Sequence, residues 1–142
     1  YTELAGQLNN LKTRLNKDDA FLGIIFLVSG LGKKLIIADQ IAIIINPYWH
    51  DYGSLGFVGA WLIVIGYTYQ IYFDFSAYTD MARGLGCFLG IRLPENFNHP
   101  YGALGIRDFW RKWHITLGNF FKENVYILTS NILCFLGLYL RV

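Results

Sequence analysis

Two long apolar stretches, separated by a polar and turn-rich segment, dominate the first half of the chain. The first covers residues 21–45, and its polar exceptions are Ser29, Lys33, Lys34, Asp39 and Gln40. At a rise of about 1.5 Å per residue, a helix of this length matches a hydrocarbon core about 30 Å thick. The pattern favours one tilted transmembrane helix whose lysines and Asp39 face protein. The alternative is a shorter helix that ends at Leu31 and is followed by a second piece.

The second apolar stretch covers residues 55–81 and is ambiguous between helix and strand. Its length favours a helix, whereas the alternation of large side chains between positions 67 and 75 also fits a strand. An isolated strand in lipid would leave its backbone amides and carbonyls without hydrogen-bond partners. We therefore predict a second long helix.

Polar residues of the second stretch fall on one side of this helix, because residues three or four apart are neighbours. One stripe contains Gly66, Gln70, Asp74 and Ala77, and a neighbouring stripe contains Ser76, Asp80 and Arg83. The two carboxylates either line a polar route or pair with a basic group such as Arg83, and pairing is favoured. Lys33 and Lys34 of the first stretch either face protein or extend their ammonium groups toward the membrane interface.

Basic residues alternate with a loop that has none. Residues 2–19 form a polar segment that carries Lys12, Arg14 and Lys17, whereas residues 46–54 contain aromatic rings but no Lys or Arg. Residues 83–112 are basic again. Because cytoplasmic loops are enriched in Lys and Arg, this predicts a helical hairpin with the 46–54 loop outside. The expected location is the cell (inner) membrane, with several spans.

A third helix is predicted from Ile106, since large apolar side chains recur at amphipathic spacing as far as Phe121. Its aromatic side carries Trp110, Trp113 and His114. The apolar tail, residues 132–140, is too short to span a bilayer by itself. The expected fold is all-α: a fragment of an integral membrane helical bundle, with an amphipathic or re-entrant helix that carries the Trp-His motif.

Composition supports a membrane protein in contact with the lipid bilayer. Hydrophobic residues make up 54% of the chain, charged residues 15%, and the mean hydropathy is +0.35. The net charge of +2 comes from dispersed basic residues, which argues against nucleic acid as a partner. Cys87 and Cys134 stand alone without metal-ligand spacing, and the chain has no nucleophile elbow, P-loop or zinc motif. We therefore predict neither a bound metal nor a bound cofactor.

His114 is the candidate catalytic residue, because a neutral imidazole can accept a hydroxyl proton near physiological pH. The structural alternative, which spacing alone favours, is a core histidine hydrogen-bonded to a carbonyl. For Trp110 and Trp113, packing in a core or at an interface is more common than stacking on a substrate. Spacing alone therefore identifies these residues without deciding their role.

Four ordered motifs resemble those of the membrane-bound O-acyltransferase family, and within it the alginate O-acetyltransferase-like branch. They are Gly32-Lys-Lys-Leu-Ile-Ile-Ala-Asp39, Gln70-Ile-Tyr-Phe-Asp-Phe-Ser-Ala-Tyr-Thr-Asp-Met-Ala82, Pro94-Glu-Asn-Phe-Asn98 with Pro100-Tyr101, and Asp108-Phe-Trp-Arg-Lys-Trp-His-Ile-Thr-Leu117. Their co-occurrence is far more specific than any one motif, and the resemblance covers most of the chain up to Ile127. The related D-alanyl transfer protein of teichoic acid synthesis has a similar Trp-His motif.

The resemblance implies a multi-pass enzyme that moves an acyl group, expected to be acetyl, onto hydroxyls of an extracytoplasmic polysaccharide. It implies an acyl thioester as donor, and acyl-donor and polysaccharide-modification proteins as partners. His114 corresponds to the family's Trp-His position near the acyl-transfer tunnel, where Trp110 and Trp113 would shape the passage. The alternative is a membrane transport or scaffold subunit that uses the same polar residues without catalysis.

The chain departs from the family pattern toward its C-terminus. The histidine to which the family's main catalytic role is assigned lies in a downstream Trp-His-Gly segment, and this sequence contains none. Lys122-Glu-Asn124 replaces a usual Arg-Asp-aromatic run, and the usual Pro-Leu-Gly-Gly continuation is missing after Ile127. We expect a partial acyltransferase domain at residues 1–127 and a divergent apolar tail at 128–142. The expectation is thus a fragment, truncated or frameshifted near Ile127, that is inactive by itself.

Overall fold

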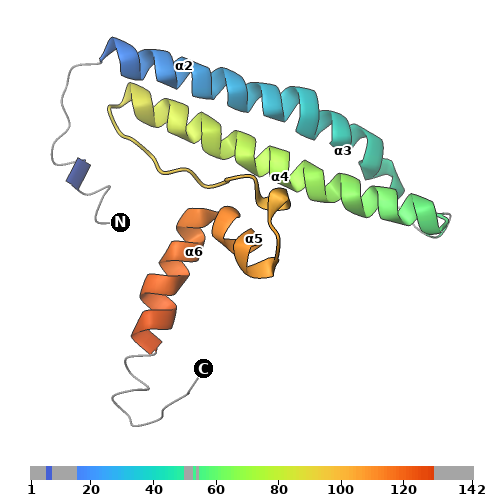
Figure 1. Ribbon diagram of the computed structural model, residues 1–142. Helices are drawn as coiled ribbons and strands as arrows, with labels where there is room; N and C mark the ends of the chain where they lie inside the picture. Colours follow the sequence, from blue (N-terminus) through green and yellow to red (C-terminus); the bar gives the residue numbers. More distant parts are fainter. Residues whose placement is uncertain (1–5, 8–15, 50–52, 54, 130–142) are drawn as a thin grey trace, which may run out of the picture. The chain divides into compact units, whose positions relative to one another are not determined.

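The computed structural model describes residues 6–7, 16–49, 53 and 55–129 of the chain (Figure 1). Every named element among these residues is helical, and the one isolated β-bridge there joins Phe97 to Trp113. The prediction of an all-α chain is therefore confirmed. The chain divides into two compact units, Tyr1–Leu93 and Pro94–Val142.

The first apolar stretch forms one uninterrupted helical segment. It consists of α2 (Lys17–Gly32), the π-helical turn η1 (Lys33–Ala38) and α3 (Asp39–Ile45), and it ends in the 3-10 helix η2 (Asn46–Trp49). The Asn16 side chain caps its start by accepting a hydrogen bond from the Asp18 amide. The single helix is thus confirmed and a break at Leu31 is wrong. Within the described residues, Lys17–Trp49 is the one helix long and apolar enough to cross a membrane.

The second apolar stretch forms α4 (Phe57–Phe88), which confirms the helix and excludes the strand. The helix has 32 residues, and its end at Phe88 lies seven positions beyond the predicted end at residue 81. The helix stops where Gly90 adopts φ 72°, a left-handed conformation that costs glycine little. The Ile91 amide then donates to the Gly86 carbonyl at 2.8 Å, which satisfies one of the last carbonyls of the helix.

The two helical segments lie side by side as an antiparallel hairpin, with α2, η1 and α3 all in contact with α4 (Figure 1). Glycines allow the close approach of α2 to α4. A Cβ added to Gly30 would lie 2.7 Å from the Ala77 carbonyl oxygen, and one added to Gly84 would lie 2.8 Å from the Gly23 carbonyl oxygen. The backbones themselves therefore touch, as in membrane helix pairs whose interface is made of small residues.

Small and polar residues occupy the inside of the hairpin, while large apolar residues face outward. Ala38 and Ala77 are 1% and 0% exposed, and Ser76 is 3% exposed. By contrast, the outward-facing Phe57 is 80% exposed and Ile36 is 74% exposed. This distribution is opposite to that of a soluble helical pair, in which the apolar face is buried.

The second unit contains short helices instead of one long helix. They are η4 (Pro100–Gly102), α5 (Ile106–Lys112), α6 (Ile115–Phe121) and the π-helical turn η5 (Lys122–Tyr126). The prediction of a continuous helix from Ile106 was wrong at the Trp-His motif. Trp113 is extended (φ −99°, ψ 123°) and His114 is left-handed (φ 45°, ψ 59°), so the motif lies between two helices instead of on one.

Several predictions of the sequence lie outside the described residues. Most of the basic segment 2–19, most of the 46–54 loop beyond η2, and the apolar tail 132–140 belong to this group. The domain boundary at Ile127, the sidedness of the loop and the complete membrane bundle stay predictions.

Candidate functional site

Lys33 is held by α4 through two polar groups. Its ammonium donates to Asp80 Oδ2 at 2.6 Å and to Ser76 Oγ at 3.1 Å. Asp80 also lies 3.7 Å from the Arg83 guanidinium, which covers the Phe26 ring at 4.3 Å. Ser76 and Asp80 are one helical turn apart and both contact Lys33 of η1, so they share one side of α4, as their stripe on the helical projection predicts. Pairing with a basic group, the favoured reading for Asp80, is therefore confirmed.

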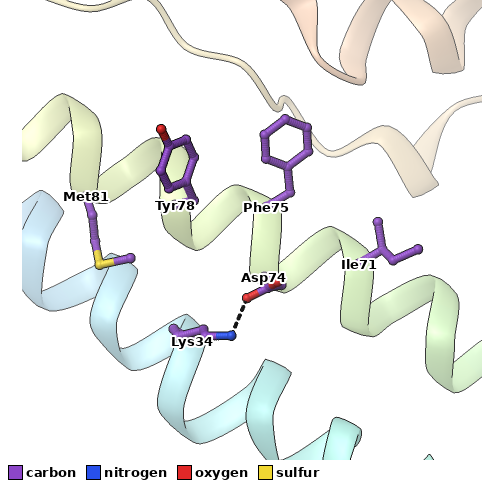
Figure 2. Close-up of a pocket in the computed structure, with 6 residues that line it drawn as sticks. All are labelled: Lys34, Ile71, Asp74, Phe75, Tyr78 and Met81. Carbon is purple, nitrogen blue, oxygen red and sulfur yellow. Dashed lines mark ion pairs between the residues drawn. The ribbon is translucent and has the colours of Figure 1, made fainter. Parts of the chain in front are cut away.

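Lys34 makes a separate pair of ionic contacts. Its ammonium lies 2.6 Å from Asp74 Oδ1 and 2.9 Å from Asp39 Oδ1. Figure 2 shows this Lys34–Asp74 pair beside Ile71, Phe75, Tyr78 and Met81, which line a cavity of about 470 Å³ with it. Apolar and aromatic side chains form most of the cavity wall, and its polar side chains are Lys34, Asp74 and Tyr78.

The π-helical turn explains how two consecutive lysines both reach α4. A π turn holds more residues than an α turn, so successive side chains are rotated by a smaller angle. Lys33 and Lys34 open this turn, and both face the neighbouring helix. The two groups together contain three cations and three anions: Lys33, Arg83 and Asp80 in one, and Lys34, Asp39 and Asp74 in the other. Every charge has a partner of opposite sign, which lowers the cost of holding it away from water.

One polar atom of α4 has no partner within the described part of the chain. Gln70 Oε1 is buried and accepts no hydrogen bond there. Gln70 lies one turn before Asp74 on the stripe predicted from the sequence. An amide oxygen buried in this way favours a donor supplied by water or by another helix.

The Trp-His motif is fixed on both sides by the loop that precedes η4. The Asn98 amide donates to the Lys112 carbonyl at 3.0 Å, and the Ile115 amide donates to the Asn96 carbonyl at 3.0 Å. The Asn96 side chain adds two more bonds, because its Oδ1 accepts from the Thr116 amide at 3.1 Å and from the Thr116 hydroxyl at 2.6 Å. The residues before and after Trp113–His114 are thus attached to one short stretch of loop.

This attachment outweighs the strain at His114. A left-handed conformation costs a non-glycine residue roughly 1–2 kcal/mol. The four hydrogen bonds contribute a net stabilisation of about 0.5–1.5 kcal/mol each, or about 2–6 kcal/mol together. Since the two fixed ends leave only two residues to close the turn, His114 takes the conformation that closes it.

Aromatic rings complete the site. Trp113 packs edge-on against Phe97 at 5.0 Å and stacks on Phe109 at 5.6 Å between ring centroids. The His114 ring lies nearly parallel to Phe97, at 6.4 Å and an interplanar angle of 15°. Phe97 is buried, at 7% exposure, so it is a fixed surface for both rings. Trp110, by contrast, is 59% exposed and makes an edge contact with Phe109.

An ion pair supports α5 next to the motif. The Lys112 ammonium donates to Asp108 Oδ2 at 2.8 Å, one turn apart on the helix. This hydrogen bond lowers the pKa of the Asp108 carboxyl below its ordinary value. Asp108 also lies in the first turn of α5, where a negative charge suits the helix dipole.

The structure separates the predicted site residues into two groups. His114 and Trp113 are joined through Phe97, whereas Trp110 is exposed beside them. Asn96 and Phe97, which contact the motif most directly, carry no signal in the periodicity of the chain. The clue available in the sequence was their place in the Pro94-Glu-Asn-Phe-Asn98 motif. Among the described residues, no group of His, Cys, Asp and Glu is arranged to hold a metal ion.

Comparison with known proteins places these motifs in a family. Residues 35–133 match MBOAT, the membrane-bound O-acyltransferase family. The chain is 50% identical over 118 residues to a peptidoglycan O-acetyltransferase of Helicobacter pylori, an alignment that covers 80% of the chain and 21% of that protein. It is 40% identical over 134 residues to a probable alginate O-acetylase of Pseudomonas syringae, covering 89% of the chain and 24% of that protein.

A shorter match, 40% identical over 70 residues, joins 49% of the chain to 18% of a teichoic acid D-alanyltransferase of Bacillus subtilis. The chain spans about a fifth to a quarter of the length of the first two relatives, at 21% and 24%. The family match extends across the second half of the hairpin's first helix, α4 and the Trp-His motif. This chain belongs to the membrane-bound O-acyltransferase family.

Proposed function

We propose that this chain is part of a membrane O-acyltransferase that transfers an acetyl group onto hydroxyls of an extracytoplasmic polysaccharide. The observation that carries the proposal is the match to the family over residues 35–133, which includes the Trp-His motif. The 50% identity to a peptidoglycan O-acetyltransferase favours a polysaccharide acceptor. The location proposed with it is the cell (inner) membrane, crossed several times, and the outward-facing apolar residues of the hairpin support it.

In this proposal His114 contributes to proton transfer. The reaction needs an acceptor for the proton of the attacking sugar hydroxyl while the new ester C–O bond forms at the acyl carbonyl, and a neutral imidazole at His114 would assist this transfer. The C–S bond of the thioester donor breaks, and the departing sulfur receives the proton. The imidazole lies nearly parallel to the buried Phe97 ring, and a defined ring orientation would present its nitrogen to the hydroxyl of a bound sugar.

The resemblance assigns the principal histidine to a Trp-His-Gly segment that this sequence does not contain. We therefore propose that His114 acts as an auxiliary residue and that the 142-residue chain alone does not catalyse acyl transfer. Trp113 shapes the passage beside it, and Trp110 does so from the exposed side. The ion pairs of the hairpin act as scaffold, since each charge has a partner.

A chimera tests the proposal. The present chain replaces the aligned segment of the Helicobacter pylori enzyme, in a strain that lacks its own peptidoglycan O-acetyltransferase. The readout is the initial rate at which alkali-labile acetate appears in the cell wall, normalised to the amount of chimera in the membrane. We expect acetylation in the chimera and its loss, by about a hundredfold or more, in His114→Asn.

His99→Asn is the matched control, because His99 has nearly the same left-handed backbone, with φ 45° and ψ 58°. Asparagine tolerates this conformation, so both substitutions remove an imidazole without new strain. His99→Asn should keep the rate. Full acetylation by the His114→Asn chimera would remove His114 from the mechanism and favour the transport or scaffold alternative.

A further inference from the structure

Asn96 differs from the other loop residues in how many groups around His114 it fixes. Its carbonyl accepts from the Ile115 amide, and its side-chain Oδ1 accepts from both the amide and the hydroxyl of Thr116. These partners are the two residues that directly follow His114. Asn96 is half-buried, whereas the Asn98 side chain, two positions later, is exposed.

The neighbour of Asn96 fixes the histidine from a second direction. Phe97 lies parallel to the His114 ring and edge-on to Trp113. Since Phe97 follows Asn96 in the chain, a shift of Asn96 would also move the aromatic ring beside the imidazole. Asn96 and Phe97 thus contact both the turn at His114 and the side of its ring.

We infer that Asn96 is a positioning residue for His114: its side chain holds the turn in which the histidine adopts its left-handed backbone, and so sets the direction of the imidazole. This role rests on the proposed function, in which His114 takes part in acyl transfer. Asn96 itself does not touch the reacting atoms in this account. Its effect passes through Thr116 and the backbone of the turn.

The activity test uses the chimera described above with three substitutions. Asn96→Ala removes the acceptor for Thr116 but keeps the backbone bond to Ile115, so the loop itself retains one attachment. We expect the acetylation rate to fall about tenfold or more, because small displacements of a reacting group are costly. Asn96→Asp retains an oxygen that accepts both bonds and should recover most of the rate. Asn98→Ala changes only an exposed side chain and keeps the backbone amide that donates to the Lys112 carbonyl, so it should leave the rate unchanged.

A structural readout separates positioning from a general loss of folding. The 142-residue chain in detergent micelles, labelled on its histidine rings, gives three sets of imidazole resonances, from His50, His99 and His114. In Asn96→Ala, the His114 resonances should shift and the Thr116 amide should exchange faster with solvent. The His99 resonances should not shift, which would show that the unit is still folded. Asn96→Asp should restore the His114 signals.

The outcomes distinguish the two claims. If His114→Asn retains full activity in the chimera, the proposed function fails, whatever Asn96 does. If His114→Asn abolishes acetylation while Asn96→Ala keeps both the rate and the His114 resonances, only the positioning role is overturned. Loss of activity in Asn96→Ala with unchanged His114 resonances would also overturn it, since the effect would then not pass through the histidine.

Discussion

The hairpin and the unit that carries the Trp-His motif place polar residues among apolar ones in different ways. In the hairpin, side chains far apart in sequence neutralise one another, as Lys33 does with Asp80, 47 positions away. In the second unit, backbone bonds and rings hold a strained turn, and the partners Asn96 and Thr116 are 20 positions apart. The charged residues of the hairpin lie in right-handed α-helical and π-helical turns, whereas His114 is left-handed.

This difference separates scaffold from candidate chemistry. Charges between two helices at close range are explained once each has a partner, and the hairpin needs no ligand to account for them. A non-glycine residue held against its backbone preference is a different observation, because packing alone would favour glycine there. His99 shares this backbone but is exposed, so the position where a function is expected is His114, which is both strained and half-buried in the Trp-His motif.

The largest effect expected in the hairpin comes from filling the contact between backbones. Gly84→Val should destabilise the purified chain in detergent by about 3 kcal/mol or more, because a Cβ at this position would lie 2.8 Å from the Gly23 carbonyl oxygen. The measurement is thermal unfolding followed by circular dichroism. Gly32→Ala is the control, since nothing lies within 4 Å of a Cβ there, and it should be neutral or stabilising. Equal behaviour of the two variants would contradict the close approach of α2 and α4.

Removal of one charge should have the next largest effect. Asp80→Asn leaves the Lys33 ammonium without its anion and should cost about 1.5–3 kcal/mol in the same unfolding experiment. Asp39→Asn should cost less, because Lys34 keeps its 2.6 Å contact with Asp74. If the Asp80→Asn chain is as stable as the parent chain, these ion pairs do not stabilise the hairpin.

His114→Gly should sharpen the comparison through opposite effects on stability and activity. Glycine relieves a left-handed strain of roughly 1–2 kcal/mol. The free energy of unfolding of the second unit should therefore be larger in His114→Gly than in His114→Ala. Hydrogen exchange of the α6 amides measures this difference. Acetylation by the chimera should nevertheless be lost. A His114→Gly chain less stable than His114→Ala would show that His114 is not strained.

The smallest effect concerns Asp108. Because Lys112 lowers the pKa of the Asp108 carboxyl in the folded chain, the unfolded chain binds this proton more tightly. The contribution of the pair to stability is therefore complete above the ordinary carboxyl pKa and is lost as the pH falls through the lowered value. Amide exchange in α5, followed from neutral to acidic pH, should show this loss. Lys112→Met should weaken the dependence, because Lys112 is the largest cause of the lowered pKa; an unchanged dependence in this variant would assign it to another group.

The positions of the helices were accessible from the sequence because their signals are local. The length of the first apolar stretch predicts one helix, and the spacing of Ser76 and Asp80 predicts that both face the same neighbour. The spacing does not reveal that Lys33 is the partner of Asp80. This ion pair depends on how the first helical segment and α4 are aligned along the hairpin. The π turn that directs both Lys33 and Lys34 toward α4 left no mark in the periodicity.

The sequence by itself determined the helical class, the polar stripe of α4 and the motifs that identify the family. Tertiary structure alone decided that the helix predicted from Ile106 breaks at Trp113 and His114. Amphipathic spacing reports only on residues three or four positions apart, and over this segment it is consistent with an unbroken helix. The break depends on bonds from Asn96 and Asn98 across the unit, whose combined stabilisation exceeds the cost of one left-handed residue.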